Sequence, residues 1–305
     1  MKLKKDLLGI AELSLEELTM ILDAAHNMKK IVLSKRKADT RLRGKTVVNM
    51  FFENSTRTRM SFELASKYLG AHLVNMTTAG SSVKKGETLI DTGKNIAAMG
   101  VDGMVIRHWN SGAPHLLARN VDIPVINAGD GMNEHPTQAL LDFMTMREKK
   151  GGFKGLNVVI TGDILHSRVV RSNIWGLLKL GAKVCVCGPS TLIPDGLEEL
   201  GVRTANDIRE AVVGADVIMG LRIQLERQKS GLFPSVGGYL KTFGIDEEIV
   251  SLAAKDVIVM HPGPVNRGVE IVSAAMESEY SAILEQVTNG VAVRMAVLEL
   301  FCGRD

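Results

Sequence analysis

The sequence is poor in the features that mark several large classes of protein. Its 3 cysteines, Cys185, Cys187 and Cys302, form neither a CxxC pair nor a Cys/His set with metal-ligand spacing, so buried free thiols are expected and no metal site. No apolar run approaches the length of a membrane span, and the N-terminus has no long apolar core with a cleavage site. We therefore expect a cytoplasmic enzyme with no membrane partner.

The sequence also lacks an excess of charge of one sign. Lys and Arg together number 37 and Asp and Glu number 34, without a long block of like charge, so no nucleic-acid partner is expected. Neither GxxxxGK[ST] nor GxGxxG follows any apolar run, so nucleotide hydrolysis and dinucleotide binding lack their usual signatures. Nothing in the sequence indicates an organic cofactor.

What the chain does contain is 45% hydrophobic residues, arranged as short apolar runs that alternate with helix-like stretches. A capping box at Ser14 and Glu17 opens an amphipathic helix. The runs predict strands at 46–52, 71–76, 101–106 and 123–127, with helices at 59–70 and 87–100. The pattern restarts after a Gly- and Lys-rich break at 149–155. This alternation predicts an α/β fold of two tandem domains, each a mostly parallel sheet with helices on both faces.

The stretch Ser55–Arg59 follows the first predicted strand and opens the next helix. Its hydroxyl groups, the N–H groups of a helix N-terminus and the arginine forks all suit phosphate oxygens. The ordinary alternative is a helix cap followed by surface arginines. Five such residues in succession favour an anion site, and the missing nucleotide motifs favour a small phosphorylated substrate.

Polar residues also stand at later strand ends, where sites in parallel sheets usually form. Taken singly, each has an ordinary explanation, either a structural histidine or a surface salt bridge. Together they indicate one site: Arg107, His135, Gln138, Arg168, Arg222 and Gln224.

At these positions the chain resembles the aspartate/ornithine carbamoyltransferase family, and within it the aspartate carbamoyltransferase catalytic chains of pyrimidine biosynthesis. The resemblance is carried, in the family's order, by STRTR, SSVKKGETL, VIRH, HPTQALLD, HSRV, LRIQLER and HPGPVNRGVEI. Ornithine carbamoyltransferases would carry an HCLP-type segment and an SMG segment. This chain has HPGP, no SMG, and LRIQ, whose arginine suits a dicarboxylate.

The resemblance implies transfer of the carbamoyl group of carbamoyl phosphate to L-aspartate by a transferase without cofactor or metal. Phosphate would be held by Ser55, Thr56, Arg57 and Thr58. Arg107, His135 and Thr58 would donate to the carbonyl oxygen, while Gln138 and the carbonyl groups of Gly263 and Pro264 would accept from the carbamoyl NH2. The aspartate carboxylates would be held by Lys85, Arg168, Arg222 and Gln224. The residues implied in catalysis are Arg57, Thr58, Lys85, Arg107 and His135.

The resemblance also implies a homotrimer with shared sites, because the family's loop at Ser81 and Lys85 reaches into the neighbouring chain. It implies a carbamoyl-phosphate-binding domain at 1–136, completed by a helix at about 288–305, and an aspartate-binding domain at 137–287. The NRGVEI segment is similar to members that work as free trimers, and the motifs assign no regulatory chain or dihydroorotase partner.

Two residues depart from the family's pattern. Asn54 stands where proline is common, which alters the presentation of the phosphate loop. Glu134 stands beside His135 where glutamine is frequent. A carboxylate at this position would raise the pKa of His135 if the two side chains approach closely.

Three alternatives remain open. The first is a carbamoyltransferase for another amine such as ornithine, against which Arg168 and Arg222 argue by repelling a cationic side chain. The second is a silent homologue serving as a scaffold, which would be expected to lose Arg57, Arg107, His135 or Lys85, and all four are present. The third is a module that binds small phosphates or nucleotides.

Overall fold

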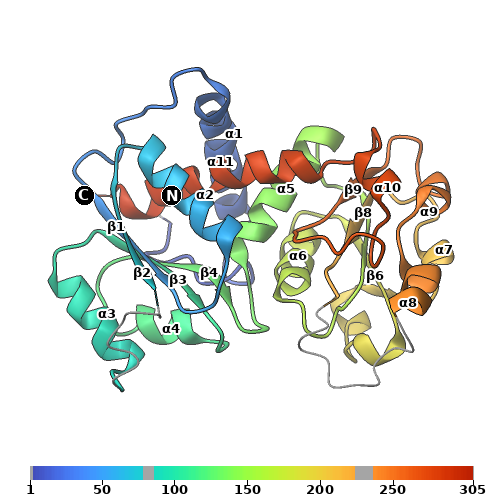
Figure 1. Ribbon diagram of the computed structural model, residues 1–305, viewed down its shortest axis with the longest axis horizontal. Coiled ribbons are helices and arrows are strands. Elements are labelled where there is room, and N and C mark those ends of the chain that lie inside the picture. Colours follow the sequence, from blue (N-terminus) through green and yellow to red (C-terminus); the bar gives the residue numbers. More distant parts are fainter. Residues whose placement is uncertain (1–2, 78–85, 224–235, 305) are drawn as a thin grey trace. The chain divides into compact units, whose positions relative to one another are not determined.

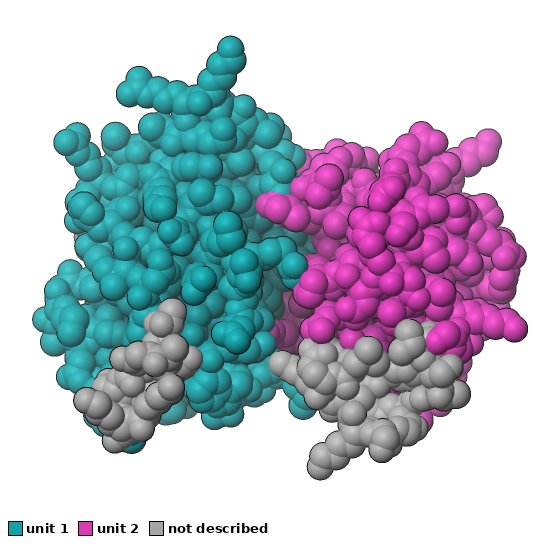
Figure 2. All heavy atoms as spheres, in the orientation of Figure 1, with its two compact units in different colours: residues 1–144, 288–305 teal, residues 145–287 magenta. Residues whose placement is uncertain are grey.

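The computed structural model describes residues 3–77, 86–223 and 236–304. The chain divides into two compact units (Figure 2). Unit 1 comprises Met1–Met144 and Thr288–Asp305, and unit 2 comprises Thr145–Val287. The C-terminal stretch therefore belongs to the same unit as the N-terminal half. The ligand assigned to each of the two expected domains stays a prediction.

Unit 1 is built on a four-stranded sheet in the order β2-β1-β3-β4 (Figure 1), in which all neighbouring strands are parallel. The N-terminal segment covers the outer strand, because Leu7 forms a parallel bridge with Ile126 of β4. The strands are β1 (Thr46–Phe51), β2 (His72–Thr77), β3 (Gly103–His108) and β4 (Val125–Asp130). The helices of this half are α1 (Leu15–Leu33), α2 (Thr56–Tyr68), α3 (Leu89–Ala98) and α4 (Ala113–Ala118).

Unit 2 contains a five-stranded sheet in the order β7-β6-β5-β8-β9, again with parallel neighbours only. Its strands are β5 (Asn157–Thr161), β6 (Lys183–Cys187), β7 (Arg203–Ala205), β8 (Val217–Gly220) and β9 (Ile258–Met260). Its helices are α6 (Arg168–Lys179), α7 (Ile208–Ala211), α8 (Val236–Phe243), α9 (Glu247–Ser251) and α10 (Ser273–Glu277), with 3-10 turns η3 (Ser190–Leu192) and η4 (Glu198–Leu200). Two further helices, α5 (Pro136–Lys150) and α11 (Ile283–Cys302), contain the boundaries between the units.

Local sequence signals explain where several helices begin and end. Ser14 caps α1, and both hydrogen bonds of the capping box with Glu17 are present. The stretches after α2 and α3 reach Gly70 and Gly100, whose φ angles of 77° and 79° lie in the left-handed region, where glycine has no Cβ penalty. These predicted elements are confirmed, as is the α/β class with its two parallel sheets.

The inner strands of both sheets are buried on two faces, which is why they read as continuous apolar runs, whereas the outer strands β2 and β7 are largely exposed or half-buried. Five of six residues in β1 are buried, and so are five of six in β3. All three cysteines are free and buried, as expected. Across the described ranges, no helix combines the length and the apolar character needed to cross a bilayer, and no group of three His, Cys, Asp or Glu side chains is arranged to hold a metal ion.

Candidate functional site

The first part of the candidate site is the turn between β1 and α2 in unit 1. Ser55 is the N-cap residue of α2, yet its side chain makes no capping hydrogen bond, and the first turn contains no acidic residue. Thr56 and Arg57 are exposed there, whereas Thr58 is buried. The positive end of this helix is thus flanked by hydroxyl groups and an arginine, which is an arrangement suited to an anion.

Arg107 lies near the end of β3, the strand next to β1, at a point where the pairing with β4 shifts register between Ile106 and His108. Such an irregularity changes the direction in which a side chain points. One guanidinium nitrogen donates to Oε1 of Glu53 at 3.0 Å and another donates to the carbonyl of Ala128 at 3.3 Å. The arginine is therefore fixed between the ends of β1 and β4.

His135 stands between β4 and α5. Its carbonyl group accepts hydrogen bonds from the N–H groups of Gln138 at 3.0 Å and Ala139 at 3.2 Å, so it precedes the helix in the position of an N-cap. The residue is 4% exposed. Gln138 is also buried and donates through Nε2 to Asp142 at 2.9 Å. Unit 1 therefore brings the residues predicted around Ser55, Arg107, His135 and Gln138 to the carboxyl edge of one sheet.

In unit 2, two predicted arginines follow neighbouring strands, because β5 and β8 pair with Thr161 opposite Gly220. Arg168 is the first residue of α6 and is buried, and Arg222 follows β8 and is half-buried. The turn before α6 is held by Asp163, whose carboxylate accepts from the backbone N–H of His166 at 3.1 Å and lies 2.9 Å from its Nδ1. This edge offers cationic side chains for a carboxylate.

Gly263 and Pro264 also belong to unit 2. They follow β9, the neighbour of β8, and the N–H of Gly263 donates to Nδ1 of His261 at 2.8 Å. Three further predicted residues, Ser81, Lys85 and Gln224, lie outside the described ranges.

Several polar residues near these positions were missed by the sequence reading. Glu53 could have been noticed, since it follows β1, the strand next to that of Arg107, and so lies at the same edge of the sheet. Arg294 gave no local signal, because it stands in the apolar helix α11 and reaches this region only through the fold. Its guanidinium lies 5.2 Å from the centre of the Phe62 ring, and burial together with the nearby charge of Arg107 lowers its pKa to about 9.

Comparison with known families accounts for nearly the whole chain. Residues 5–148 match the model described as the aspartate/ornithine carbamoyltransferase carbamoyl-P binding domain, and residues 154–301 match that of the Asp/Orn binding domain. The chain belongs to the aspartate/ornithine carbamoyltransferase family. The resemblance predicted from the sequence motifs is thus confirmed.

Two curated members of the family illustrate how close the relation is. The chain is 63% identical over 301 residues to the aspartate carbamoyltransferase catalytic subunit of Acetivibrio thermocellus, covering 99% of this chain and 96% of the relative. It is 61% identical over 302 residues to the catalytic subunit of the same name from Caldanaerobacter subterraneus, covering 99% of both chains.

Solved structures from both branches of the family share the fold. Aspartate transcarbamoylase from Trypanosoma cruzi, in complex with N-(phosphonacetyl)-L-aspartic acid, superposes with a TM-score of 0.88 at 29% identity, covering 96% of this chain and 94% of that one. Ornithine carbamoyltransferase from Thermus thermophilus also has a TM-score of 0.88, at 28% identity with 99% and 100% covered. Enzymes for either acceptor therefore share this fold, and the fold does not identify the acceptor. Particular residues and close relatives bear on that choice.

Proposed function

We propose that this chain is an aspartate carbamoyltransferase: it transfers the carbamoyl group of carbamoyl phosphate to the amino group of L-aspartate, giving N-carbamoyl-L-aspartate and phosphate in de novo pyrimidine biosynthesis. The observation that carries the proposal is the 63% identity, over 99% of the chain, to a protein named aspartate carbamoyltransferase catalytic subunit. The three buried free thiols fit the reducing cytoplasm in which we place the activity.

Carbamoyl phosphate binds at the carboxyl edge of the unit 1 sheet in this proposal. The hydroxyl groups of Ser55, Thr56 and Thr58 and the N-terminal turn of α2 hold its phosphate. Arg57 neutralises the charge that grows as phosphate leaves, since a guanidinium matches two phosphate oxygens at once. The open N-terminus of α2, without an acidic residue in its first turn, supports this assignment.

Arg107, His135 and Thr58 donate hydrogen bonds to the carbonyl oxygen. Negative charge accumulates on that oxygen as the amine attacks, and donors already fixed in place stabilise it without reorganisation. The contacts of Arg107 with Glu53 and Ala128 support such a fixed donor. Gln138 and the carbonyl groups of Gly263 and Pro264 accept from the carbamoyl NH2 and fix its plane.

Arg168 and Arg222, with Gln224 and Lys85, bind the two carboxylates of L-aspartate and direct its amino group at the carbonyl carbon. Orientation of the second substrate is a large contribution in a reaction between two molecules. A solved structure supports the pairing of substrates, because the Trypanosoma cruzi enzyme has been crystallised in complex with carbamoyl phosphate and aspartate.

The attacking amine must lose a proton, and in this proposal the departing phosphate accepts it. The pH dependence of kcat distinguishes this route from a protein base. A protein base would be indicated if kcat fell as one protein group became protonated and if this pH dependence disappeared when that group alone was substituted. That result would contradict the phosphate route.

The test of the function is phosphate release from carbamoyl phosphate in three parallel reactions, with L-aspartate, L-ornithine and no acceptor. Release with L-aspartate only is the expected result. Release with ornithine only would show that Arg168 and Arg222 have been given the wrong role. A folded chain that releases no phosphate with either acceptor would instead favour the silent homologue.

We further propose that the active unit is a homotrimer in which Ser81 and Lys85 act in the site of the neighbouring chain. The Lys85→Ala and Arg57→Ala chains should each be inactive alone. Mixed after dissociation, they should regain part of the activity, because some shared sites then contain both intact residues. Trimers that exchange chains but stay inactive would contradict shared sites.

A further inference from the structure

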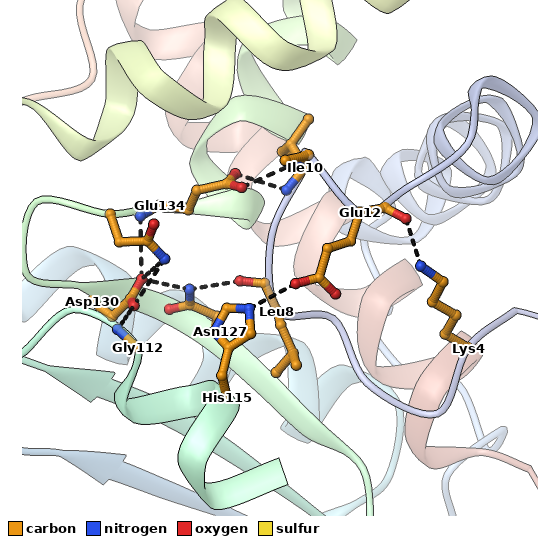
Figure 3. Close-up of polar contacts among 11 residues, drawn as sticks. Lys4, Leu8, Ile10, Glu12, Gly112, His115, Asn127, Asp130 and Glu134 are labelled. Atoms are coloured by element: carbon orange, nitrogen blue, oxygen red, sulfur yellow. Dashed lines mark hydrogen bonds and ion pairs between the residues drawn. The ribbon is translucent and has the colours of Figure 1, made fainter. Parts of the chain in front are cut away.

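The loop that carries His135 is tied to the N-terminal segment by the side chain of Glu134 (Figure 3). Oε2 of Glu134 accepts a hydrogen bond from the N–H of Ile10 at 2.7 Å, and Oε1 accepts one from the N–H of Ala11 at 3.2 Å. Glu134 as a whole is 6% exposed. A mostly buried carboxylate therefore spans two stretches of chain that are more than a hundred residues apart in sequence.

A second connection joins the same two stretches through Asn127 and Asp130. The side-chain amide of Asn127 donates to the carbonyl of Leu8 at 2.8 Å and also to Oδ1 of Asp130 at 2.8 Å. Asp130 in turn accepts from the backbone N–H of Glu134 at 3.2 Å, and its own N–H donates to the Glu134 carbonyl at 3.2 Å. The backbone of residue 134 is thus held from the end of β4 while its side chain reaches the N-terminal segment (Figure 3).

The space beside Gly9 is shaped by this carboxylate. A Cβ atom at residue 9 would lie 2.4 Å from Oε1 of Glu134, which is closer than carbon and oxygen can approach. A flexible carboxylate could ordinarily move aside, but this one would have to give up its hydrogen bonds to Ile10 and Ala11. Glycine at position 9 therefore permits the contact.

The chemistry of the contact calls for a carboxylate. Two backbone N–H donors face the two oxygens of Glu134, and both oxygens of an ionised carboxylate are acceptors. A glutamine in the same place has one acceptor oxygen, and its NH2 group would face the second N–H. Of the two donors, the N–H of Ile10 makes a buried contact and that of Ala11 a partly buried one. Leaving the buried donor without its partner would cost about 1–3 kcal/mol.

We propose that Glu134 is a positioning residue for the transfer reaction: by fixing residue 134 to the segment at 10–11, it sets the place of the His135 side chain. The inference rests on the proposed function, in which His135 donates to the carbonyl oxygen. His135 is held on its other side by the start of α5, where its carbonyl accepts from Gln138 and Ala139. Anchors on both sides fix the backbone from which the imidazole projects.

The sequence alone suggested another role for this carboxylate, which was to raise the pKa of His135 by proximity. The hydrogen bonds from Ile10 and Ala11 instead support a role through position. Substitution at Gly9 separates the two roles, because Gly9→Ala displaces the carboxylate from its donors without removing its charge.

The test compares Glu134→Gln and Gly9→Ala with Glu12→Gln as the matched control. Glu12 lies in the same N-terminal segment, and its carboxylate pairs with Nε2 of His115 at 2.6 Å (Figure 3). We expect kcat to fall about 10- to 100-fold in both Glu134→Gln and Gly9→Ala, because small misplacements of a reacting group have effects of this size. KM for L-aspartate should change less than about twofold, and Glu12→Gln should keep the kcat of the unsubstituted chain.

All kinetic measurements are made well below the unfolding temperature of each variant, so that a loss of folded protein cannot imitate the effect. The double variant Gly9→Ala/Glu134→Gln should lose little more than either single one, since both remove the same contact. A kcat of Glu134→Gln within twofold of the unsubstituted chain would overturn the proposal. So would equal losses in Glu134→Gln and Glu12→Gln, or losses that multiply in the double variant.

A second readout keeps this inference separate from the proposed function. The imidazole NMR signals of His135 are recorded without substrate and assigned by their absence in His135→Asn. They should shift in Glu134→Gln and Gly9→Ala. They should stay in place in Glu12→Gln. If the unsubstituted chain releases no phosphate while these shifts occur, the proposed function fails and the positioning contact stands. Unchanged His135 signals in an active chain would refute the contact alone.

Discussion

Units 1 and 2 share a plan and differ in the groups that follow their strands. Both have parallel sheets with polar residues after the carboxyl ends. In unit 1 these groups are hydroxyls at the start of α2, an arginine paired with Glu53 and a histidine ahead of α5. In unit 2 they are Arg168 and Arg222. In the proposed function, one architecture thus serves an acyl phosphate in one half and a dicarboxylate in the other, since the loops determine the chemistry.

The largest effect should come from removing the fixed donor in unit 1. Arg107→Ala is expected to lower kcat about 10²- to 10³-fold, as loss of a donor to a developing oxyanion typically does. The measurement is phosphate release at saturating carbamoyl phosphate and L-aspartate. Arg209→Ala, which breaks an exposed pair with Glu248 in unit 2, serves as the control and should retain full activity. A kcat of Arg107→Ala within threefold of the unsubstituted value would contradict the role of this residue.

The corresponding change in unit 2 should separate the two substrates. Arg222→Ala is expected to raise KM for L-aspartate about 10- to 100-fold, because hydrogen bonds to charged groups contribute roughly 1.5–3 kcal/mol. Protection of the chain against thermal unfolding by carbamoyl phosphate should be retained. Equal weakening of both substrates would show that the division of ligands between the units is wrong.

A smaller effect concerns how closely the loops of unit 2 approach one another. Gly162 has a φ angle of 138°, and a Cβ there would lie 2.8 Å from Cβ of Leu221. Gly214 has a φ angle of 66° with open space around it. In chemical unfolding we expect Gly214→Ala to lose about 1 kcal/mol from backbone strain, and Gly162→Ala to lose about 1–3 kcal/mol more from the collision. Equal losses would contradict the close approach of these loops.

The smallest effect should come from the thiols, one in each unit. Burial raises the pKa of both Cys187 and Cys302 to about 12 from an ordinary value of 9.0. Each thiol keeps its proton in the folded chain above pH 9 while the unfolded chain loses it. The stability that this contributes is therefore complete below pH 9 and is lost as the pH rises toward 12, by about 1.4 kcal/mol per pH unit for each thiol.

The variant Cys302→Ser tests this pH dependence in unit 1. The free energy of unfolding, measured by urea titration between pH 8 and pH 10.5, should fall less steeply in the variant than in the unsubstituted chain. Identical slopes would mean that the Cys302 thiol ionises equally in the folded and unfolded chains.

The comparison also shows how much of the site was open to prediction. Ser55, Arg107 and Arg222 could be located from sequence because each follows an apolar run, and the order of such runs predicts which ends share an edge. Arg294 could not be located in this way. It stands in the last helix, far along the chain from Phe62, and only packing brings the two together.

The role of Glu134 shows the same division. Its place beside His135 was visible in the sequence, and the first role that this suggested was electrostatic. Its hydrogen bonds to Ile10 and Ala11 depend on the N-terminal segment lying along β4. No local sequence pattern predicts this pairing.

The sequence by itself determined the α/β class, the two parallel sheets, the helix ends at Ser14, Gly70 and Gly100, and the family. These follow from the spacing of apolar residues, from caps and turns, and from short motifs, all of which act over a few neighbouring residues. The tertiary structure alone decided the strand order, the pairing of Arg107 with Glu53 and the anchoring of the His135 loop. Such contacts join residues that are distant in the chain, and their partners are chosen by how whole elements pack.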